Sequence, residues 1–329
     1  MGPGGDRGVL SFVEQIVNLS NMTTSSAPGK IILFGEHAVV YGRPALAVPV
    51  TQVHADVEVL DSARAGIWIQ APAVNLHAEL NTLPSDHPVA SVIHNFFFFS
   101  RVSPFPNLEI RISSTIPVAS GLGSGAAVSV ALVRALSAHL GKQMTDKEVS
   151  AFVYEIERLH HGTPSGIDNT VVTFAQPVYF VKGQPIETFR VGSPFTIVIG
   201  DTGISAPTKE SVHDVQRLWM NDKARWETLF DNIAEVSFTA RRVIEQGWVK
   251  MLGELMDENH ALLQQMTVSS PELDTLVEAA RKAGAFGAKM SGGGRGGNMI
   301  ALVSPEIAET VSASLKEAGA KNTIITQVS

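Results

Sequence analysis

The sequence has no cysteine at all, and only three tyrosines and four tryptophans among its 329 residues. Without thiols there can be no disulfides, no thiolate catalysis and no zinc site built on cysteine. No apolar run reaches the ~18 residues that a membrane-spanning helix needs, so we expect no membrane segment. The formal net charge is −7 and the basic residues form no continuous stripe, which argues against a nucleic-acid partner. An anionic ligand would therefore have to be met locally, by backbone amides, a few basic side chains or a metal ion.

Residues 1–25 are expected to be a flexible N-terminal extension. Asp6, Arg7 and Glu14 interrupt its short amphipathic stretch, which argues against a secretory signal peptide and predicts a cytoplasmic protein. The chain is long enough for two domains. Alternating strands and helices fill residues 26–190, and a nearly continuous helical region then covers 208–266 before helices and strands finish the chain. This order predicts an α+β protein with a boundary near residue 190.

Four consecutive phenylalanines occupy residues 96–99, within a stretch that is typical of a buried helix. Four adjacent side chains surround a helix, so at least some of them must be covered by the core. An exposed pair among them would instead mark a dimer contact or a patch for a lipid tail.

The segment TIPVASGLGSGAAVSVALVRAL, residues 115–136, passes from a strand through glycines into a helix. It is not a P-loop, because no G-x-x-x-x-G-K-[ST] occurs in the chain. Gly121 to Ala126 do match the dinucleotide pattern G-x-G-x-x-[GA], but the second strand that a dinucleotide fold needs before Asp146 is missing. Glycines allow close backbone approach, and amides at a helix N-terminus attract anions. A phosphate site and a plain packing turn both remain open on this evidence.

Three further features accompany this loop. Lys30 starts a strand in SAPGKIILFGEHAVVYG, and ERLHHGTPSGIDN places Glu157 on a helix and Asp168 in a turn. A second glycine loop lies within KMSGGGRGGNMIAL, residues 289–302. Taken alone, a lysine at a strand edge is usually solvated, and an aspartate in a turn usually caps the backbone.

Together these motifs resemble the GHMP small-molecule kinases, with an N-terminal PGK motif, a central GLGSG loop and a C-terminal glycine loop. The resemblance is closest to the branch that phosphorylates mevalonate, and it runs from about Ser26 to the end of the chain. It implies an N-terminal domain like ribosomal protein S5 over residues 26–190, which carries the ATP and substrate loops. It also implies a ferredoxin-like α+β domain over residues 191–329, and a homodimer.

The activity implied by this resemblance is ATP-dependent phosphorylation of the 5-hydroxyl of (R)-mevalonate, a step of isoprenoid biosynthesis. Asp168 would act as general base, and Lys30 would stabilise the reacting oxygen and the transferring group. Glu157 and Ser124 would hold Mg²⁺. The residues expected to contact the substrate are Glu36, His37 and Thr208. Those expected to bind ATP are Pro117, Ser120, Gly121, Leu122, Gly123, Ser124, Gly125 and Ala126.

Two departures from the family pattern bear on this assignment. Gly125 replaces the second loop serine, which is the usual magnesium ligand, and Arg295 stands where the family has glycine. Residues expected to reach a phosphate or the substrate from this second loop are Gly292, Gly293, Gly294 and Arg295. Two alternatives remain: a sister kinase acting on phosphomevalonate, on the 3-hydroxyl of mevalonate or on a sugar, and a binding protein without catalysis.

Overall fold

The computed structural model describes residues 22–117, 120–161, 164–185, 187–205 and 208–329. The first sheet has seven strands in the order β4-β3-β5-β2-β6-β7, and β1 pairs with β2 outside this path. Its strands are β1 (Met22–Phe34), β2 (Ala45–Asp61), β3 (Ile67–Ala71), β4 (Leu76–Glu79), β5 (Leu108–Ser114), β6 (Val178–Phe180) and β7 (Glu187–Thr188). β1 begins within the stretch expected to be an extension, because residues 22–25 pair with residues 57–60 of β2.

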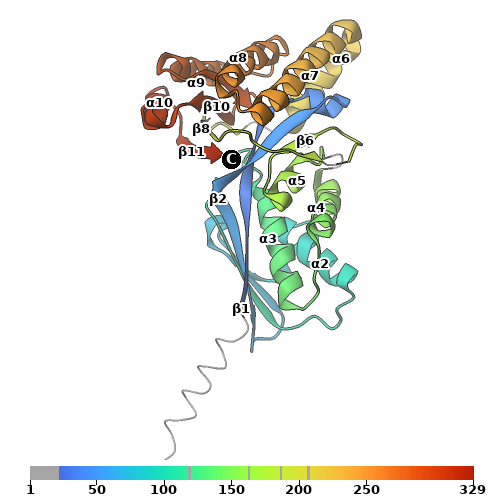
Figure 1. Cartoon of the computed structure of the whole chain (residues 1–329). Coiled ribbons are helices and arrows are strands. Elements are labelled where there is room, and N and C mark those ends of the chain that lie inside the picture. The colour runs from blue at the N-terminus through green and yellow to red at the C-terminus, as the bar shows by residue number, and fades with distance from the viewer. Residues whose placement is uncertain (1–21, 118–119, 162–163, 186, 206–207) are drawn as a thin grey trace, which may run out of the picture.

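Four helices lie on one side of this sheet (Figure 1). They are α2 (Pro88–Ser100), α3 (Ser124–His139), α4 (Asp146–His161) and α5 (Ile167–Phe174). Helix α3 packs against both β1 and β2, because its small and aliphatic side chains, such as Ala127 and Val130, are fully buried there. Thr145, the residue that the sequence predicts as N-cap of this helix, forms a capping box with Glu148 at the start of α4. Helix α5 was not predicted, because Gly-Thr-Pro-Ser-Gly precedes it and it has only 8 residues.

The second sheet has four antiparallel strands in the order β11-β8-β10-β9. They are β8 (Phe195–Asp201), β9 (Gly287–Ser291), β10 (Asn298–Val303) and β11 (Asn322–Val328). The helices of this part are α6 (Thr208–Asn221), α7 (Lys223–Gln246), α8 (Val249–Gln265), α9 (Pro271–Lys282) and α10 (Ala308–Glu317). None of the helices in the described ranges combines the length and apolarity needed to cross a bilayer.

The helical region 208–266 is divided into three helices rather than being continuous. Asp222 caps α7 by accepting a hydrogen bond from the Arg225 N–H at 3.2 Å. Gly247, at φ +73°, ends the same helix in the left-handed conformation that glycine tolerates best. The prediction of a nearly continuous helical region is thus confirmed, and its short breaks lie at these two capping residues.

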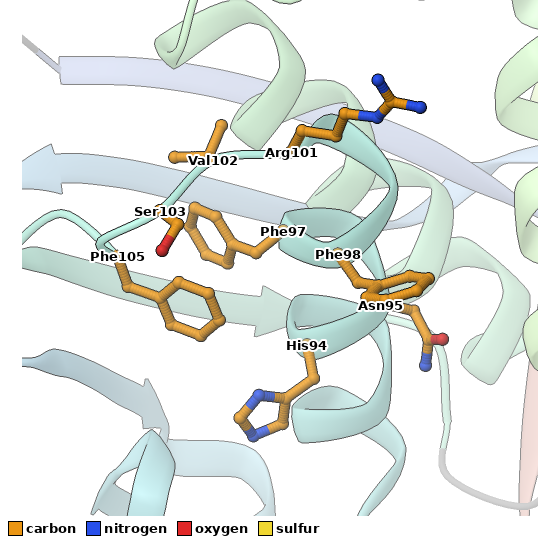
Figure 2. A pocket seen from close by; sticks show the side chains of 8 residues that line it. All are labelled: His94, Asn95, Phe97, Phe98, Arg101, Val102, Ser103 and Phe105. Carbon is orange, nitrogen blue, oxygen red and sulfur yellow. The ribbon is translucent and has the colours of Figure 1, made fainter.

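The four phenylalanines divide evenly between core and surface. Phe96 and Phe97 are buried, whereas Phe98 and Phe99 are 77% and 63% exposed. Beside them α2 and the following loop form a hollow of about 600 Å³ (Figure 2). Its lining residues are His94, Asn95, Phe97, Phe98, Arg101, Val102, Ser103 and Phe105. Phe98 and Phe99 are therefore the exposed pair for which a dimer contact or a lipid-tail patch stays a prediction, and the other lining residues lie outside the segments with a predicted catalytic or binding role.

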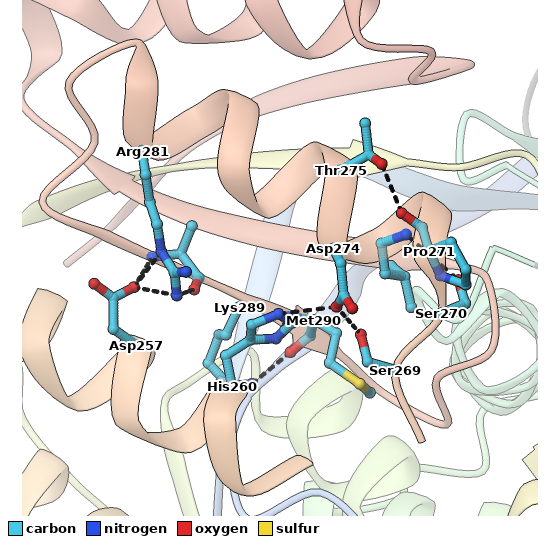
Figure 3. A network of polar contacts seen from close by, with 12 residues as sticks. Asp257, His260, Ser269, Ser270, Pro271, Asp274, Thr275, Arg281, Lys289 and Met290 are labelled. Atoms are coloured by element: carbon cyan, nitrogen blue, oxygen red, sulfur yellow. Dashed lines mark hydrogen bonds and ion pairs between the residues drawn. The ribbon is translucent and has the colours of Figure 1, made fainter. Parts of the chain in front are cut away.

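Strand β9 forms one edge of the second sheet, and side chains of α8 satisfy its outward backbone groups (Figure 3). The Asp257 carboxylate accepts from the Ala288 N–H at 2.9 Å, and His260 Nδ1 accepts from the Met290 N–H at 3.3 Å. The other ring nitrogen, Nε2, lies 3.1 Å from the Asp274 carboxylate. His260 is therefore a neutral ring with its proton on Nε2. Without such partners these edge N–H groups would be buried and unpaired.

We predict that His260 makes the protein less stable in acid. Burial lowers its pKa from 6.5 to about 4. Between these two pH values His260 binds a proton in the unfolded chain but not in the folded one. The free energy of unfolding therefore falls as the pH drops from about 6.5 to about 4. A difference of this size corresponds to roughly 3 kcal/mol. Urea unfolding at pH 7.5 and at pH 5 measures how much the free energy of unfolding falls between the two pH values. This fall should be smaller in His260→Asn than in the unmodified protein. An equal loss in both proteins would contradict the prediction.

Candidate active site

The first glycine loop lies directly on Lys30. The Lys30 N–H donates to the Leu122 carbonyl at 2.9 Å. A Cβ on Gly123 would come within 2.8 Å of Lys30 Cγ, and Gly123 also has φ +76°. Any side chain there would therefore collide with the lysine stem and strain the backbone. Helix α3 starts at the next residue, so the loop presents backbone amides and a helix N-terminus beside Lys30.

Lys30 forms an ion pair with Asp168. Its Nζ lies 2.8 Å from Asp168 Oδ1; the lysine side chain is only 7% exposed, while the aspartate is 36% exposed. The two residues come from distant parts of the chain, β1 and the first turn of α5. A carboxylate in the first turn of a helix is favoured by the helix dipole. One member of this pair is thus enclosed, and the other is open to a ligand.

Glu157 lies on α4 within electrostatic reach of the same pair. Its pKa is raised from 4.5 to about 8, first by burial and second by the charge of Asp168, while Lys30 opposes the rise. The site therefore holds two carboxylates and one ammonium group. A further cation would relieve the unfavourable burial of the Glu157 charge, so the donor set fits a hard divalent ion.

The segment that follows β1 turns away from the sheet through Gly35, Glu36 and His37. Glu36 forms a fully buried ion pair with Lys289 of β9. His37 Nε2 lies 3.1 Å from the Gly293 carbonyl and donates to it, while burial lowers the pKa of His37 from 6.5 to about 4. The prediction that Glu36 contacts a ligand needs correction, because an enclosed carboxylate bound to lysine presents no surface to one.

The second glycine loop contacts the segment after α8, helix α6 and the first glycine loop. A Cβ on Gly294 would lie 1.9 Å from the Val268 carbonyl, so only glycine fits there. Arg295 adopts φ +59° and donates from Nη1 to Asp214 Oδ2 of α6 at 2.6 Å. Asn298 donates from its side-chain amide to the Ser120 carbonyl, which joins this loop to the first one. Arg295 is thus held by α6, and its predicted contact with a phosphate or substrate stays a prediction.

The structure brings together Lys30, Asp168, Glu157 and the loop from Gly121 to Ser124. Ser120, just before that loop, has its hydroxyl engaged within the chain, because it donates to the Pro117 carbonyl at 2.8 Å. The described residues do not include 118–119 or the side chain of Thr208, so the predicted substrate contact of Thr208 lies outside them.

Sequence reasoning missed Lys289, Asn298 and Asp214 as partners of the site. The only available signal was for Lys289, a single charged residue in the otherwise uncharged strand GAKMS. Strands buried on both faces are normally apolar throughout, so a lysine there requires a buried acid.

This arrangement suits the transfer of an anionic group to a hydroxyl. Asp168 can accept a proton from a hydroxyl group, Lys30 can stabilise the resulting oxygen, and the loop amides can bind phosphate. Within the described ranges no three His, Cys, Asp or Glu side chains converge as a protein-only metal site would require.

Comparison with known proteins gives consistent matches. A family model described as the GHMP kinases N terminal domain matches residues 89–176, and one described as GHMP kinases C terminal matches 240–321. A mevalonate kinase of Pyrococcus abyssi is 35% identical and covers 94% of this chain and 97% of its own. One from Thermococcus sibiricus is also 35% identical, with coverages of 93% and 96%. The crystal structure of L. major mevalonate kinase in complex with R-mevalonate has a TM-score of 0.84 at 28% identity, covering 94% of this chain and 98% of its own.

Proposed function

Because this chain belongs to the GHMP kinases, we propose that it transfers the γ-phosphoryl group of ATP to the 5-hydroxyl of (R)-mevalonate. The observation that carries this proposal is the ion pair of Lys30 and Asp168 beside the first glycine loop. The expected two-domain α+β kinase fold agrees with the two family models and with the neighbouring structure. Relatives over nearly the whole chain are named mevalonate kinase, which favours mevalonate over the sister substrates.

In the proposed reaction Asp168 accepts the proton of the 5-hydroxyl as the oxygen attacks the γ-phosphorus. The bond from that phosphorus to the β–γ bridging oxygen breaks, and ADP leaves. Lys30 sits 2.8 Å from the carboxylate and stabilises negative charge on the attacking and transferring oxygens. Phosphoryl transfer needs positioning and charge stabilisation above all, and the loop over residues 120–126 supplies backbone amides for both.

Glu157 and Ser124 are the residues that would hold Mg²⁺. The raised pKa of Glu157 in the absence of a cation fits this role, because a bound cation favours the charged carboxylate. A Mg²⁺ ion held there would supply positive charge against the phosphates of ATP. His37 and Thr208 are proposed to lie on the mevalonate side of the site, and Arg295 is proposed to reach a phosphate or the substrate. From the family resemblance we also propose a cytoplasmic homodimer.

The experiment that tests this function measures ADP release with Mg²⁺ and ATP across four acceptors: (R)-mevalonate, 5-phosphomevalonate, galactose and homoserine. Turnover on mevalonate alone is the expected result. Turnover on 5-phosphomevalonate alone would contradict the substrate assignment while leaving the mechanism intact. ATP binding without turnover on any acceptor would contradict the catalytic proposal itself.

We predict that Gly125→Ser strengthens the binding of Mg²⁺. A Cβ at this position meets nothing within 4 Å, so serine fits without displacing a neighbour. An added contact to a charged group is worth about 1.5–3 kcal/mol, which lowers the Mg²⁺ concentration for half-maximal activity by about 10- to 100-fold. Ser124→Ala should raise that concentration. Magnesium titrations of both variants at saturating ATP check this, and an unchanged midpoint in both would contradict the assigned ligands.

A further inference from the structure

Lys289 is a buried charge that the proposed reaction does not use. Its side chain has no exposed surface, and its ammonium group donates to the Glu36 carboxylate and, at 2.6 Å, to the Met290 carbonyl. Glu36 is equally enclosed, and the two residues are 253 positions apart in sequence. The pair therefore joins the second sheet to the segment that follows β1.

Lys289 itself is held in a fixed place. The backbone N–H groups of both its neighbours, Ala288 and Met290, bind the side chains of Asp257 and His260 on α8 (Figure 3). One residue further on, Ser291 donates from its hydroxyl to the Ile32 carbonyl of β1 at 2.7 Å. Residues on both sides of Lys289 are thus anchored, which directs its side chain toward the end of β1.

The segment that Lys289 binds has an unusual backbone. Gly35 has φ +92°, and a Cβ there would lie 2.3 Å from the Pro44 carbonyl. His37, which is not glycine, has φ +60°. Such a conformation persists only where the surrounding contacts determine it. Two side-chain contacts with the second half of the molecule do so, from Glu36 to Lys289 and from His37 to the Gly293 carbonyl.

We propose that Lys289 is a positioning residue for phosphoryl transfer. By binding Glu36 it fixes residues 35–37, and so sets the place of His37 relative to Lys30 of β1. This inference rests on the proposed function, because His37 is assigned to the mevalonate side of the site. A buried ion pair is often no more stable than apolar residues of similar size, so specific geometry is a better reason for this pair than stability.

The test compares Lys289→Met with the double variant Glu36→Leu/Lys289→Met. Lys289→Met should lower kcat/KM for mevalonate about 100-fold, the cost of a misplacement near 1 Å, with little change in KM for ATP. The double variant leaves no unpaired buried charge, so its Tm should recover. Its kcat/KM should stay low, because no directed contact holds residue 36. The matched control is Lys282→Met, which removes an exposed lysine of α9 and should change neither quantity.

The ring signals of His37 in NMR spectra provide a readout that does not depend on the substrate. They should shift in both Lys289 variants and stay in place in Lys282→Met. Recovery of both Tm and kcat/KM in the double variant, or unshifted His37 signals, would overturn the inference and leave the pair with a structural role. A wild-type protein that is inactive on mevalonate would contradict the proposed function instead, and the His37 signals would still decide the inference.

Discussion

Asp168→Asn is expected to lower kcat for mevalonate by about 10²–10⁴-fold, the range that general base catalysis contributes. Asparagine keeps the size and shape of the side chain but cannot accept the hydroxyl proton. Asp168 is 36% exposed and forms its ion pair with Lys30 at the surface of the site, so the fold should tolerate the change. The KM for ATP should change little, because the glycine loop remains intact.

Steady-state kinetics of Asp168→Asn, with a thermal melt of each preparation, check this expectation. Asp231→Asn is a suitable control, because it alters an exposed aspartate that is also paired with a basic residue, Arg43. The control should retain full activity. If Asp168→Asn keeps kcat within a few-fold of the wild type, Asp168 orients the hydroxyl at most, and the proposed general base is wrong.

Lys30→Met is expected to lower kcat by about 10²–10³-fold, as loss of one preorganised charge at a reacting oxygen does in other enzymes. Methionine preserves the apolar stem that packs under Gly123, so the loop keeps its support. The change also removes the cation that opposes the raised pKa of Glu157, so that pKa should move above about 8. A larger fraction of Glu157 would then be protonated at neutral pH, so the Mg²⁺ concentration for half-maximal activity should rise.

A magnesium titration and a kcat measurement on Lys30→Met separate these two effects. Excess Mg²⁺ should restore only the part of the loss that comes from Glu157. Lys30→Arg retains the positive charge, but its larger planar head does not fit the 2.8 Å contact to Asp168 in the same way, so partial activity is expected. Full restoration of Lys30→Met by Mg²⁺ alone would contradict a direct role of Lys30 in catalysis.

Local sequence patterns predicted the buried strands and the helix cap, because both depend on residues close together in the chain. Residues 287–291 and 298–303 have the composition of buried strands, and both form them. Thr145 was predicted as the N-cap of α4, and it takes that position in contact with Glu148. Helix α5 escaped prediction because a run of glycine, proline and serine precedes it and it is too short to show helical periodicity.

The residues of the site could be predicted only where a sequence motif resembled one of the family's motifs. The spacing of Lys30 and Asp168 gives no local reason for them to meet, so their pairing came from the family resemblance and not from the residues alone. The contact of Glu36 with Lys289 had no such support. Glu36 was predicted from the family resemblance to contact the substrate, and neither Glu36 nor Lys289 has a local pattern that identifies the other as its partner. Burial and ion pairing between distant segments follow from the packing of the two sheets, which sequence periodicity does not encode.

The most direct test of the proposed function is the position of the phosphate in the product made from ATP and (R)-mevalonate. In a ³¹P NMR spectrum recorded without proton decoupling, an ester of the primary 5-hydroxyl is split into a triplet by its two methylene protons. An ester of the tertiary 3-hydroxyl has no proton on the adjoining carbon and gives a single line. We predict the triplet; a single line, or no organic phosphate beyond that of the nucleotides, would contradict the account.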